Sequence, residues 1–408
     1  MKSMSSLFLR IAMSIALIVF YFPLVSGAVV TMYMPDTLAV IEDTGMPRPE
    51  VRDTITIALL LPFQVEANAE ADTATVTAPV VLKESLPALH FMESALLLRD
   101  SLRARGIMVY YKVADTGYDS LATVAFLSRG DMKGVDAVIS LLPQQYTSDL
   151  SRAAMRWEKP VWFFSAPNTR LLEKNPWLRL MVPSNTTQIR LTAEYLALNH
   201  ASARCITVYR EQRRENDIAA LFAECIDSLR IGGDSCRAFN YARGGWTGLR
   251  KKMSESQENL ILVPTTDESF LSTIINDMGD DRKALSIRFC GMPSWENFHS
   301  IDQELMSELR TMFFNGLFID GDYPPVADFR KRFMEACSAD PLPSAFLAHD
   351  AILSVVRSLP GGEDATSGWP FLLSRNSNRM ERVSETGGME NRTVNIIRFG
   401  EVALIRVN

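Results

Sequence analysis

The chain has 408 residues, more than one typical domain needs, so two domains are expected. Hydrophobic residues make up 47% of it and charged residues 22%, the balance of a globular protein with a substantial core. The net charge is -6, and Lys and Arg are scattered along the chain rather than clustered. This pattern excludes the basic footprint of a protein that binds nucleic acid.

The first 28 residues have the pattern of a targeting segment. Lys2 and Arg10 precede an apolar run that ends at Val25, and the small residues SGA follow. We therefore predict a signal peptide over residues 1–28, whose cleavage releases the mature protein into the periplasm. The alternative is an uncleaved N-terminal membrane anchor, because residues 11–30 carry no charge and are long enough to span a bilayer.

The cysteines are too few for a small disulfide scaffold. They are Cys205, Cys225, Cys236, Cys290 and Cys337, with no CxxC pair and no metal-ligand spacing. Single buried thiols are the favoured interpretation. The first three nevertheless lie close enough in sequence to supply one bridge.

Strands and helices alternate after a polar, proline-containing linker over residues 29–53. The segments in order are the strand ITIALLL, the helix 86–105, the strand IMVYYKVADTG, a helix over 121–127, the strand VDAVISLL, the helix TSDLSRAAMRWEK and the strand PVWFFSAPN. The stretch QVEANAEADTATVTAPV after the first strand is expected to be irregular. The order of the elements predicts a parallel sheet with helical crossovers.

The same rhythm restarts after RLMVPSN. Helices at 187–199, 217–230, 246–254 and 267–278 alternate with the strands CITVYR, SCRAFNY, NLILVP and LSIRFCG. The chain then continues with the strand FFNGLFID, the helices PVADFRKRFMEAC and SAFLAHDAILSVVRSL, and the closing strands TVNIIRF and VALIRV. The predicted fold class is α/β, with two doubly wound lobes that have parallel central sheets.

Several segments together resemble the type I periplasmic-binding domain, the fold of branched-chain amino-acid-binding proteins of ABC importers. They are IALLLPF, HFMESALLLRDSL, VADTG, GMPSWENF followed by IDQEL, AFLAHDAILSVVRSL and GGMENRTVNIIRFGEVALIRV. The nearest likeness is to envelope proteins that pair such a domain with an N-terminal LysM module, and no LysM-like segment is visible here. The resemblance covers residues 54–408.

The resemblance implies that three hinge crossovers join the lobes, the first near residues 181–185. The first lobe would hold residues 54–183 and 318–360, and the second residues 184–317 and 361–408. A ligand would bind in the cleft between the lobes, where the carboxyl ends of the strands meet.

Signatures of catalysis are missing from the sequence. It has no GxSxG elbow, HExxH, P-loop or GxGxxG motif, and its four histidines are far apart. We therefore expect a protein that is not an enzyme and that needs no cofactor and no metal.

The resemblance places two first-lobe loops at the ligand, where the family holds the ligand with small residues and hydroxyls. The first loop, SLLPQQYT, offers Gln144, Tyr146 and Thr147, and the second, SAPNT, offers Ser165 and Asn168. Prolines stand at Pro143 and Pro167, where the family tends to place a serine and a threonine.

The second lobe offers Tyr209, Asp267 and Trp295 for the opposite wall. The alternative for Trp295 is a place in the core. The mixed-charge run at residues 210–217 is interpreted as the solvated start of a helix, with Asn216 or Asp217 as its cap.

Two functions fit these observations. The first is a periplasmic solute-binding protein that closes on a small polar ligand, such as an amino acid or peptide, and works with an inner-membrane ABC permease. The second is an envelope scaffold or regulator of peptidoglycan-synthesis proteins, in which the cleft is vestigial.

Overall fold

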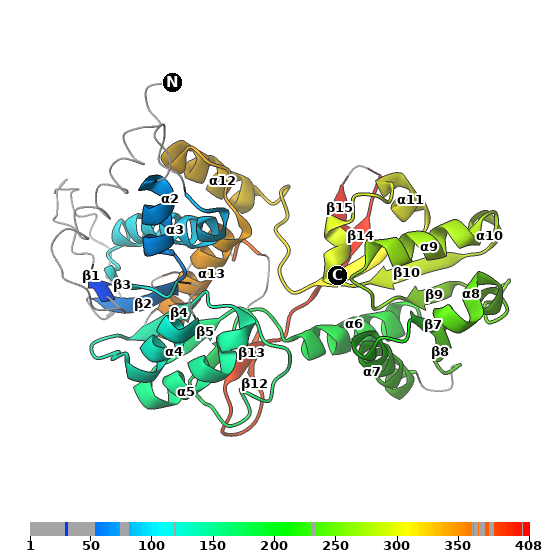
Figure 1. The fold of residues 1–408 in the computed structure, drawn as a ribbon, viewed down its shortest axis with the longest axis horizontal. Coiled ribbons are helices and arrows are strands. Elements are labelled where there is room, and N and C mark those ends of the chain that lie inside the picture. The colour runs from blue at the N-terminus through cyan, green and yellow to red at the C-terminus, as the bar shows by residue number, and fades with distance from the viewer. Residues whose placement is uncertain are drawn as a thin grey trace. The chain divides into compact units, whose positions relative to one another are not determined.

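The computed structural model describes residues 29–31, 54–73, 81–117, 120–230, 234–360, 362, 366, 372–374, 379–401 and 403–408. They form two compact units (Figure 1). Unit 1 ends at Val182 and resumes over Ile319–Asn391, and unit 2 consists of Pro183–Phe318 and Arg392–Asn408. The chain thus crosses between the units three times, as predicted, and the first crossing lies within the predicted hinge.

Unit 1 is built on an eight-stranded sheet in the order β1-β3-β2-β4-β5-β6-β13-β12. The strands are β1 (Val29–Thr31), β2 (Ile55–Leu61), β3 (Val109–Asp115), β4 (Ala137–Ser140), β5 (Val161–Phe163), β6 (Leu178–Leu180), β12 (Met380–Arg382) and β13 (Met389–Asn391). The six inner strands run parallel, and the two edge strands are antiparallel to their neighbours.

Helices cover both faces of this sheet. They are α2 (Val65–Thr73), α3 (Leu86–Arg103), α4 (Ser120–Arg129), α5 (Thr147–Trp157), α12 (Pro324–Cys337) and α13 (Pro343–Ser358), with the short 3-10 helices η1 (Lys83–Ser85) and η2 (Gln144–Tyr146). Ile57 and Leu59 of β2 belong to the core formed with α3 and α13, whereas Ala58 and Leu60 belong to the core formed with α4 and α5. The apolar run at 55–61 is therefore buried on both faces, as its sequence predicts.

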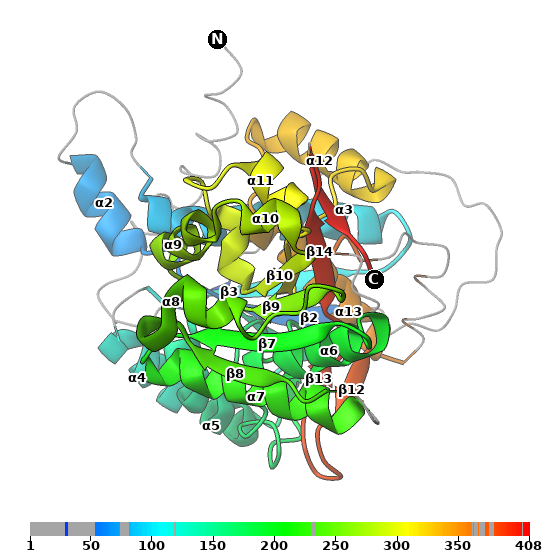
Figure 2. The ribbon, with the colours of Figure 1, turned by 90° about the vertical axis from the view of Figure 1, so that its right-hand side faces the viewer.

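Unit 2 contains a seven-stranded sheet in the order β15-β14-β11-β10-β9-β7-β8. Its strands are β7 (Arg204–Tyr209), β8 (Arg237–Asn240), β9 (Asn259–Leu262), β10 (Ile287–Gly291), β11 (Met312–Asn315), β14 (Asn395–Phe399) and β15 (Leu404–Arg406). Figure 2 shows β10, β9, β7 and β8 side by side in this order. Five neighbouring strands of this sheet are parallel, namely β8, β7, β9, β10 and β11. Strands β14 and β15 complete the sheet in antiparallel pairing.

The helices of unit 2 are α6 (Asn185–Asn199), α7 (Arg213–Leu229), α8 (Tyr241–Arg250), α9 (Glu268–Met278), α10 (Asp281–Ala284) and α11 (Gln303–Glu308), with the 3-10 helix η3 (Pro293–Asn297). Helix α6 packs on α7, and α8 packs on α9. The predicted helix at 246–254 lies earlier in the structure, because α8 begins at Tyr241 and bends at Gly245.

The predicted boundary of the last crossover is wrong. Residues 361–408 were all expected in the second lobe, but β12 and β13 belong to the sheet of unit 1. The free parallel edge of β6 accepts β13 in the register Met389↔Arg179, and the Asn391 side chain donates a hydrogen bond to the Met181 carbonyl. Only the stretch from Arg392 onward enters unit 2.

Two further expectations within residues 29–80 are wrong. Val29–Thr31 were assigned to the linker but form β1, which pairs with β3. The stretch after β2 was expected to be irregular but forms α2 over Val65–Thr73. Its first turn is held by Asp115, whose carboxylate accepts hydrogen bonds from the backbone amides of Gln64 at 3.1 Å and Val65 at 2.9 Å. A cap supplied 50 positions later in the chain stabilises a helix that the local sequence does not favour.

One disulfide bond links Cys205 on β7 with Cys236, which directly precedes β8. The bond is one of the pairings that the sequence allowed. Cys225, Cys290 and Cys337 are buried free thiols. Within the described part of the chain, no helix has the length and apolar character needed to span a membrane. The predicted signal peptide lies outside the described residues.

Candidate functional site

The carboxyl edge of the unit 1 sheet brings two of the predicted residues together. Strands β4 and β5 are parallel neighbours, so the loops that follow them leave the sheet at the same edge. The Ser165 hydroxyl donates a hydrogen bond to the side-chain oxygen of Gln144 at 3.2 Å, and both residues are exposed. This pair presents a hydroxyl oxygen and an amide group to solvent, and these groups can both donate and accept hydrogen bonds.

The other predicted residues of unit 1 are buried or form local hydrogen bonds. Tyr146 and Thr147 are buried, and the Thr147 hydroxyl donates to the Gln144 carbonyl at 2.8 Å. The side-chain oxygen of Asn168 accepts the Arg170 amide at 3.0 Å, which closes a local turn. Tyr146 and Thr147, which were expected at the ligand, therefore present little surface to solvent.

Asp115 fills a position at this edge that the sequence analysis did not assign. Its carboxylate accepts the amides of Gln64, Val65 and Gly117, the last at 2.8 Å. The amino end of a helix at the carboxyl edge of a parallel sheet is suited to an anion. Here the protein supplies that anion itself. The signal in the sequence was an acidic residue at the end of a buried strand.

The carboxyl edge of the unit 2 sheet carries a network centred on Arg210, which directly follows β7. Its guanidinium donates to Glu215 at 2.6 Å, to Asp267 at 2.7 Å and to the Thr265 hydroxyl at 3.2 Å. The centroid of the Phe270 ring lies 4.4 Å from the central carbon of the guanidinium. Because β7 and β9 are parallel neighbours, residues 57 positions apart meet at this edge.

The electrostatics of this network leave one carboxylate in excess, because one guanidinium faces the two carboxylates of Glu215 and Asp267. Hydrogen bonds from Ser269 and Arg210 lower the pKa of Asp267 to about 2, so its carboxylate is ionised at neutral pH. The Glu215 side chain is 7% exposed, whereas that of Asp267 is 40% exposed. Asp267 is therefore the charged group of this network that solvent reaches most easily.

The interpretation of residues 210–217 as the solvated start of a helix is wrong for Glu215, which is buried, and for the predicted cap. Helix α7 begins at Arg213, so Asn216 and Asp217 lie inside it and do not cap it. Glu215 points back and accepts the backbone amide of Arg210 at 3.1 Å. Burial of this carboxylate is compensated by the guanidinium beside it.

Trp295 does not present its ring to a ligand in this structure. It is 0% exposed, its indole nitrogen donates to the Thr265 carbonyl at 2.8 Å, and its ring stacks on Phe298. The expectation that Trp295 lines a binding wall is therefore wrong, and the core alternative holds. Tyr209 is half-buried at the end of β7, next to Arg210.

Loss of the Arg210 guanidinium should destabilise unit 2. We expect Arg210→Ala to lower the free energy of unfolding by about 2–3 kcal/mol, because it leaves the buried Glu215 carboxylate without its partner. Arg213→Ala is the matched control: its side chain is 96% exposed, and removing it should cost less than about 0.5 kcal/mol. Urea unfolding measures both variants. Equal losses would show that the Arg210 network contributes no more than a surface ion pair.

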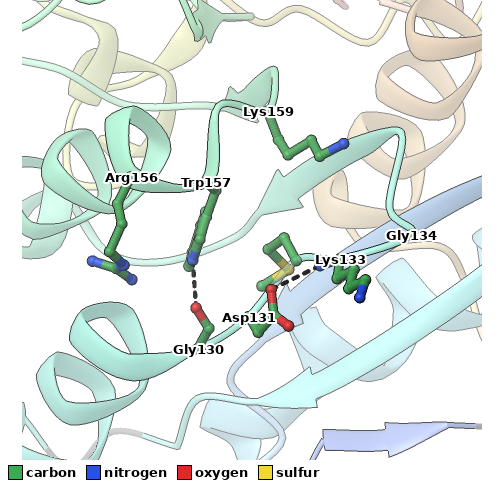
Figure 3. A pocket seen from close by; sticks show the side chains of 8 residues that line it. Gly130, Asp131, Lys133, Gly134, Arg156, Trp157 and Lys159 are labelled. Carbon is green, nitrogen blue, oxygen red and sulfur yellow. Dashed lines mark hydrogen bonds between the residues drawn. The ribbon is translucent and has the colours of Figure 1, made fainter.

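A pocket of about 430 Å³ lies at the opposite, amino edge of the unit 1 sheet (Figure 3). It is lined by residues that follow α4 and by the end of α5. The Trp157 indole donates to the Gly130 carbonyl at 2.7 Å, and Arg156 donates to the Leu127 carbonyl. These side chains satisfy carbonyls at the end of α4. None of the predicted site residues lines this pocket. In the described part of the chain, no cluster of three or more His, Cys, Asp or Glu is arranged to hold a metal ion.

Comparison with known proteins gives similarity at the level of the fold. No family model and no curated relative matches the chain. A putative branched-chain amino-acid ABC transporter protein from Rhodospirillum rubrum is 12% identical with a TM-score of 0.61, over 87% of this chain and 100% of that one. An ABC transporter substrate-binding protein from Desulfitobacterium hafniense, in complex with leucine, is 15% identical with a TM-score of 0.54 and the same coverage.

A third similar structure is the C-domain of LpoA from Haemophilus influenzae, a regulator of PBP1A. It is 11% identical with a TM-score of 0.54, and the match covers 86% of this chain and 100% of that domain. Substrate-binding proteins and a regulator thus share one architecture with this chain. The two mostly parallel sheets, the flanking helices and the three crossings identify the fold of this chain as that of the type I periplasmic-binding domains.

Proposed function

We propose that this protein is an exported, non-catalytic solute-binding protein that holds a small polar ligand at the carboxyl edges of its sheets. The observation that carries the proposal is the ionised, partly exposed Asp267 carboxylate at the edge of the unit 2 sheet. The exposed Gln144–Ser165 pair would supply uncharged hydrogen-bonding groups from the edge of the unit 1 sheet. An inner-membrane ABC permease is the partner that such a role implies.

The charges favour a ligand with an amino group. The Arg210 network carries one more carboxylate than cation, and its exposed member is Asp267. In unit 1, Asp115 already occupies the amino end of α2, so that helix end offers no place for the carboxylate of a ligand. We therefore propose an amine, or an amino acid or peptide recognised chiefly through its amino group.

A thermal-shift screen tests this proposal. We expect a cognate ligand at a hundred times its dissociation constant to stabilise the protein by about 2.7 kcal/mol. Amino acids, simple amines, dipeptides and muropeptides form the panel. Asp267→Asn should abolish the shift, because the neutral amide cannot form an ion pair with an ammonium group.

Asp302→Asn is the matched control. Asp267 and Asp302 both cap a helix in unit 2, accepting the amides of Ser269 at 3.0 Å and Glu304 at 2.9 Å. Asn caps a helix about as well as Asp, so both variants keep their caps, but Asp267→Asn also loses its ion pair with Arg210, and its stability without ligand is measured separately. A ligand shift that survives in Asp267→Asn would reject the proposed role of this carboxylate.

A second function is favoured by the likeness to the LpoA C-domain and by the burial of Trp295, Tyr146 and Thr147. In this alternative the chain is an envelope scaffold or regulator that binds peptidoglycan-synthesis proteins through its surface. The absence of any thermal shift across the panel, together with binding to a purified peptidoglycan synthase, would support it over the solute-binding role.

Export rests on three supports. The sequence pattern of residues 1–28 predicts a signal peptide, the substrate-binding proteins that share the fold serve ABC transporters, and the Cys205–Cys236 bond is typical of an oxidising compartment. We propose the periplasm as the location. N-terminal sequencing of the protein after periplasmic extraction should give a chain that begins near Val29. An intact Met1 in the membrane fraction would favour the anchor instead.

A further inference from the structure

Two titratable side chains lie one turn apart on α3, where unit 1 packs α12 and α13 against this helix. They are His90 and Glu93. Helix α12 follows directly after the second crossing between the units. Neither side chain belongs to the carboxyl edge of the sheet, and nothing in the proposed function uses them.

Glu93 is half-buried, and one oxygen of its carboxyl group, Oε2, is covered by the protein without a hydrogen-bond partner among the described residues. An unpaired buried carboxylate is unfavourable, whereas a neutral carboxylic acid is tolerated much better. Burial raises the pKa of Glu93 to about 7, and contact with the Cys337 thiol of α12 offsets part of that rise.

His90 is held in its neutral form by a hydrogen bond. It is 8% exposed, and its Nδ1 accepts the backbone amide of Leu342, in the connection between α12 and α13, at 3.1 Å. Protonation of Nδ1 would remove this acceptor and bury a charge. Its ring centroid lies 5.3 Å from that of Phe333 on α12. Burial lowers the pKa of His90, while Asp340 partly opposes the change.

Among the described residues, the other titratable groups around α3 are hydrogen-bonded or exposed, apart from the Cys337 thiol, whose pKa burial raises to about 12. Arg330 of α12 pairs with Asp340 at 3.0 Å, His349 of α13 contacts Asp350 at 3.1 Å, and Tyr111 of β3 donates to the Ala95 carbonyl at 2.9 Å. Lys83 and Glu84 on η1 are exposed. His90 and Glu93 are therefore the groups at this contact whose burial depends on the docking of α12.

We propose that Glu93 and His90 form a pH-compensating contact that keeps α12 docked on α3 as the pH changes, because the two groups respond to protons in opposite directions. At slightly acidic pH, burial favours the neutral form of each group when α12 is docked. Undocking exposes both, so that Glu93 releases a proton and His90 takes one up. Over the range where both events occur, the net proton change is close to zero and docking does not depend on pH.

The signs follow from the direction of each change. The pKa of Glu93 is higher in the docked state, so its contribution is complete below about pH 4.5 and is lost as the pH rises through about 7. The pKa of His90 is lower in the docked state, so its contribution is complete above about pH 6.5 and is lost as the pH falls. Removal of one group should therefore reveal the pH dependence of docking that the other group causes.

Hydrogen exchange of the α12 amides, corrected for intrinsic rates, measures docking between pH 5 and pH 8. We expect a nearly flat profile for the wild type. His90→Asn keeps an acceptor for the Leu342 amide but cannot titrate, so protection should fall by about 10- to 70-fold between pH 5 and pH 8. Glu93→Gln should show the reverse trend, losing protection as the pH falls.

The controls separate compensation from simple loss of packing. Glu84→Gln removes an exposed carboxylate on η1 and should leave the profile flat, and so should the double variant Glu93→Gln/His90→Asn. Flat profiles in both single variants would overturn the proposal. Carbon-13 NMR of the wild-type carboxyl groups gives a second readout that needs no variant. If no glutamate titrates near pH 7, the proposal is wrong.

Discussion

Replacement of Trp295 by alanine should lower the free energy of unfolding by about 3–5 kcal/mol, one of the largest effects of any single substitution in this chain. The side chain is fully buried, so its removal opens a cavity in the core of unit 2. The Thr265 carbonyl also loses the hydrogen bond that it accepts from the indole nitrogen at 2.8 Å. Strand β10 is shaped around this ring, because a Cβ atom on Gly291 would lie 2.1 Å from it.

Urea denaturation followed by circular dichroism measures the loss in Trp295→Ala. Leu198→Ala is the control for removal of a large apolar side chain, since Leu198 is 71% exposed on α6 and should change stability by less than about 0.5 kcal/mol. Trp295→Phe should fall between the two. If Trp295→Ala unfolds no more easily than Leu198→Ala, the ring is not a core element, and its role at a binding wall has to be reconsidered.

The sequence predicted the elements whose signal is local and strong. The apolar run at 55–61 predicted a strand buried on both faces, and β2 is an inner strand of the unit 1 sheet, between β3 and β4. The alternation of strands and helices through 204–291 predicted the second sheet with small boundary errors. Apolar periodicity suffices in these segments because burial in a parallel sheet leaves little room for polar side chains.

The sequence failed where distant parts of the chain decide the local structure. Helix α2 depends on a cap from Asp115. Strand β13 depends on the free edge of β6, and the hydrogen bond from Asn391 to Met181 joins residues 210 positions apart. A pattern search over neighbouring residues cannot detect such partners. The same limit explains why Arg210, assigned to a solvated helix start, and Asp267, assigned to a binding wall, were not recognised as a pair.

Trp295 shows a different limit. An aromatic residue after a strand at the carboxyl edge is equally compatible with stacking on a ligand and with packing in the core. Only the partners of its indole nitrogen and the contact at Gly291 decide between them, and these depend on the tertiary structure. The exposed candidates that remain, Asp267, Gln144 and Ser165, are polar groups whose neighbours the sequence did not specify.

Removal of the Cys205–Cys236 bond should cost about 3–4 kcal/mol of stability. The bond closes a loop with a sequence separation of 31 residues, and the loss of chain entropy in the unfolded state scales with the length of that loop. It ties β8 to β7, and β8 is the strand at one end of the unit 2 sheet. Because half of β8 is exposed, few apolar contacts replace the bond when it is absent.

The double variant Cys205→Ala/Cys236→Ala, compared with the wild type in the presence and absence of a reductant, measures this cost. Reduction should lower the unfolding midpoint of the wild type but leave that of the variant unchanged. Cys225→Ala is the control, because it removes a buried free thiol and should keep the full response to reductant. Hydrogen exchange should locate the loss first in β8, where the strand has one neighbour instead of two. A wild type that reductant does not destabilise would show that the bond contributes nothing to the fold, and it would remove one of the three supports for export.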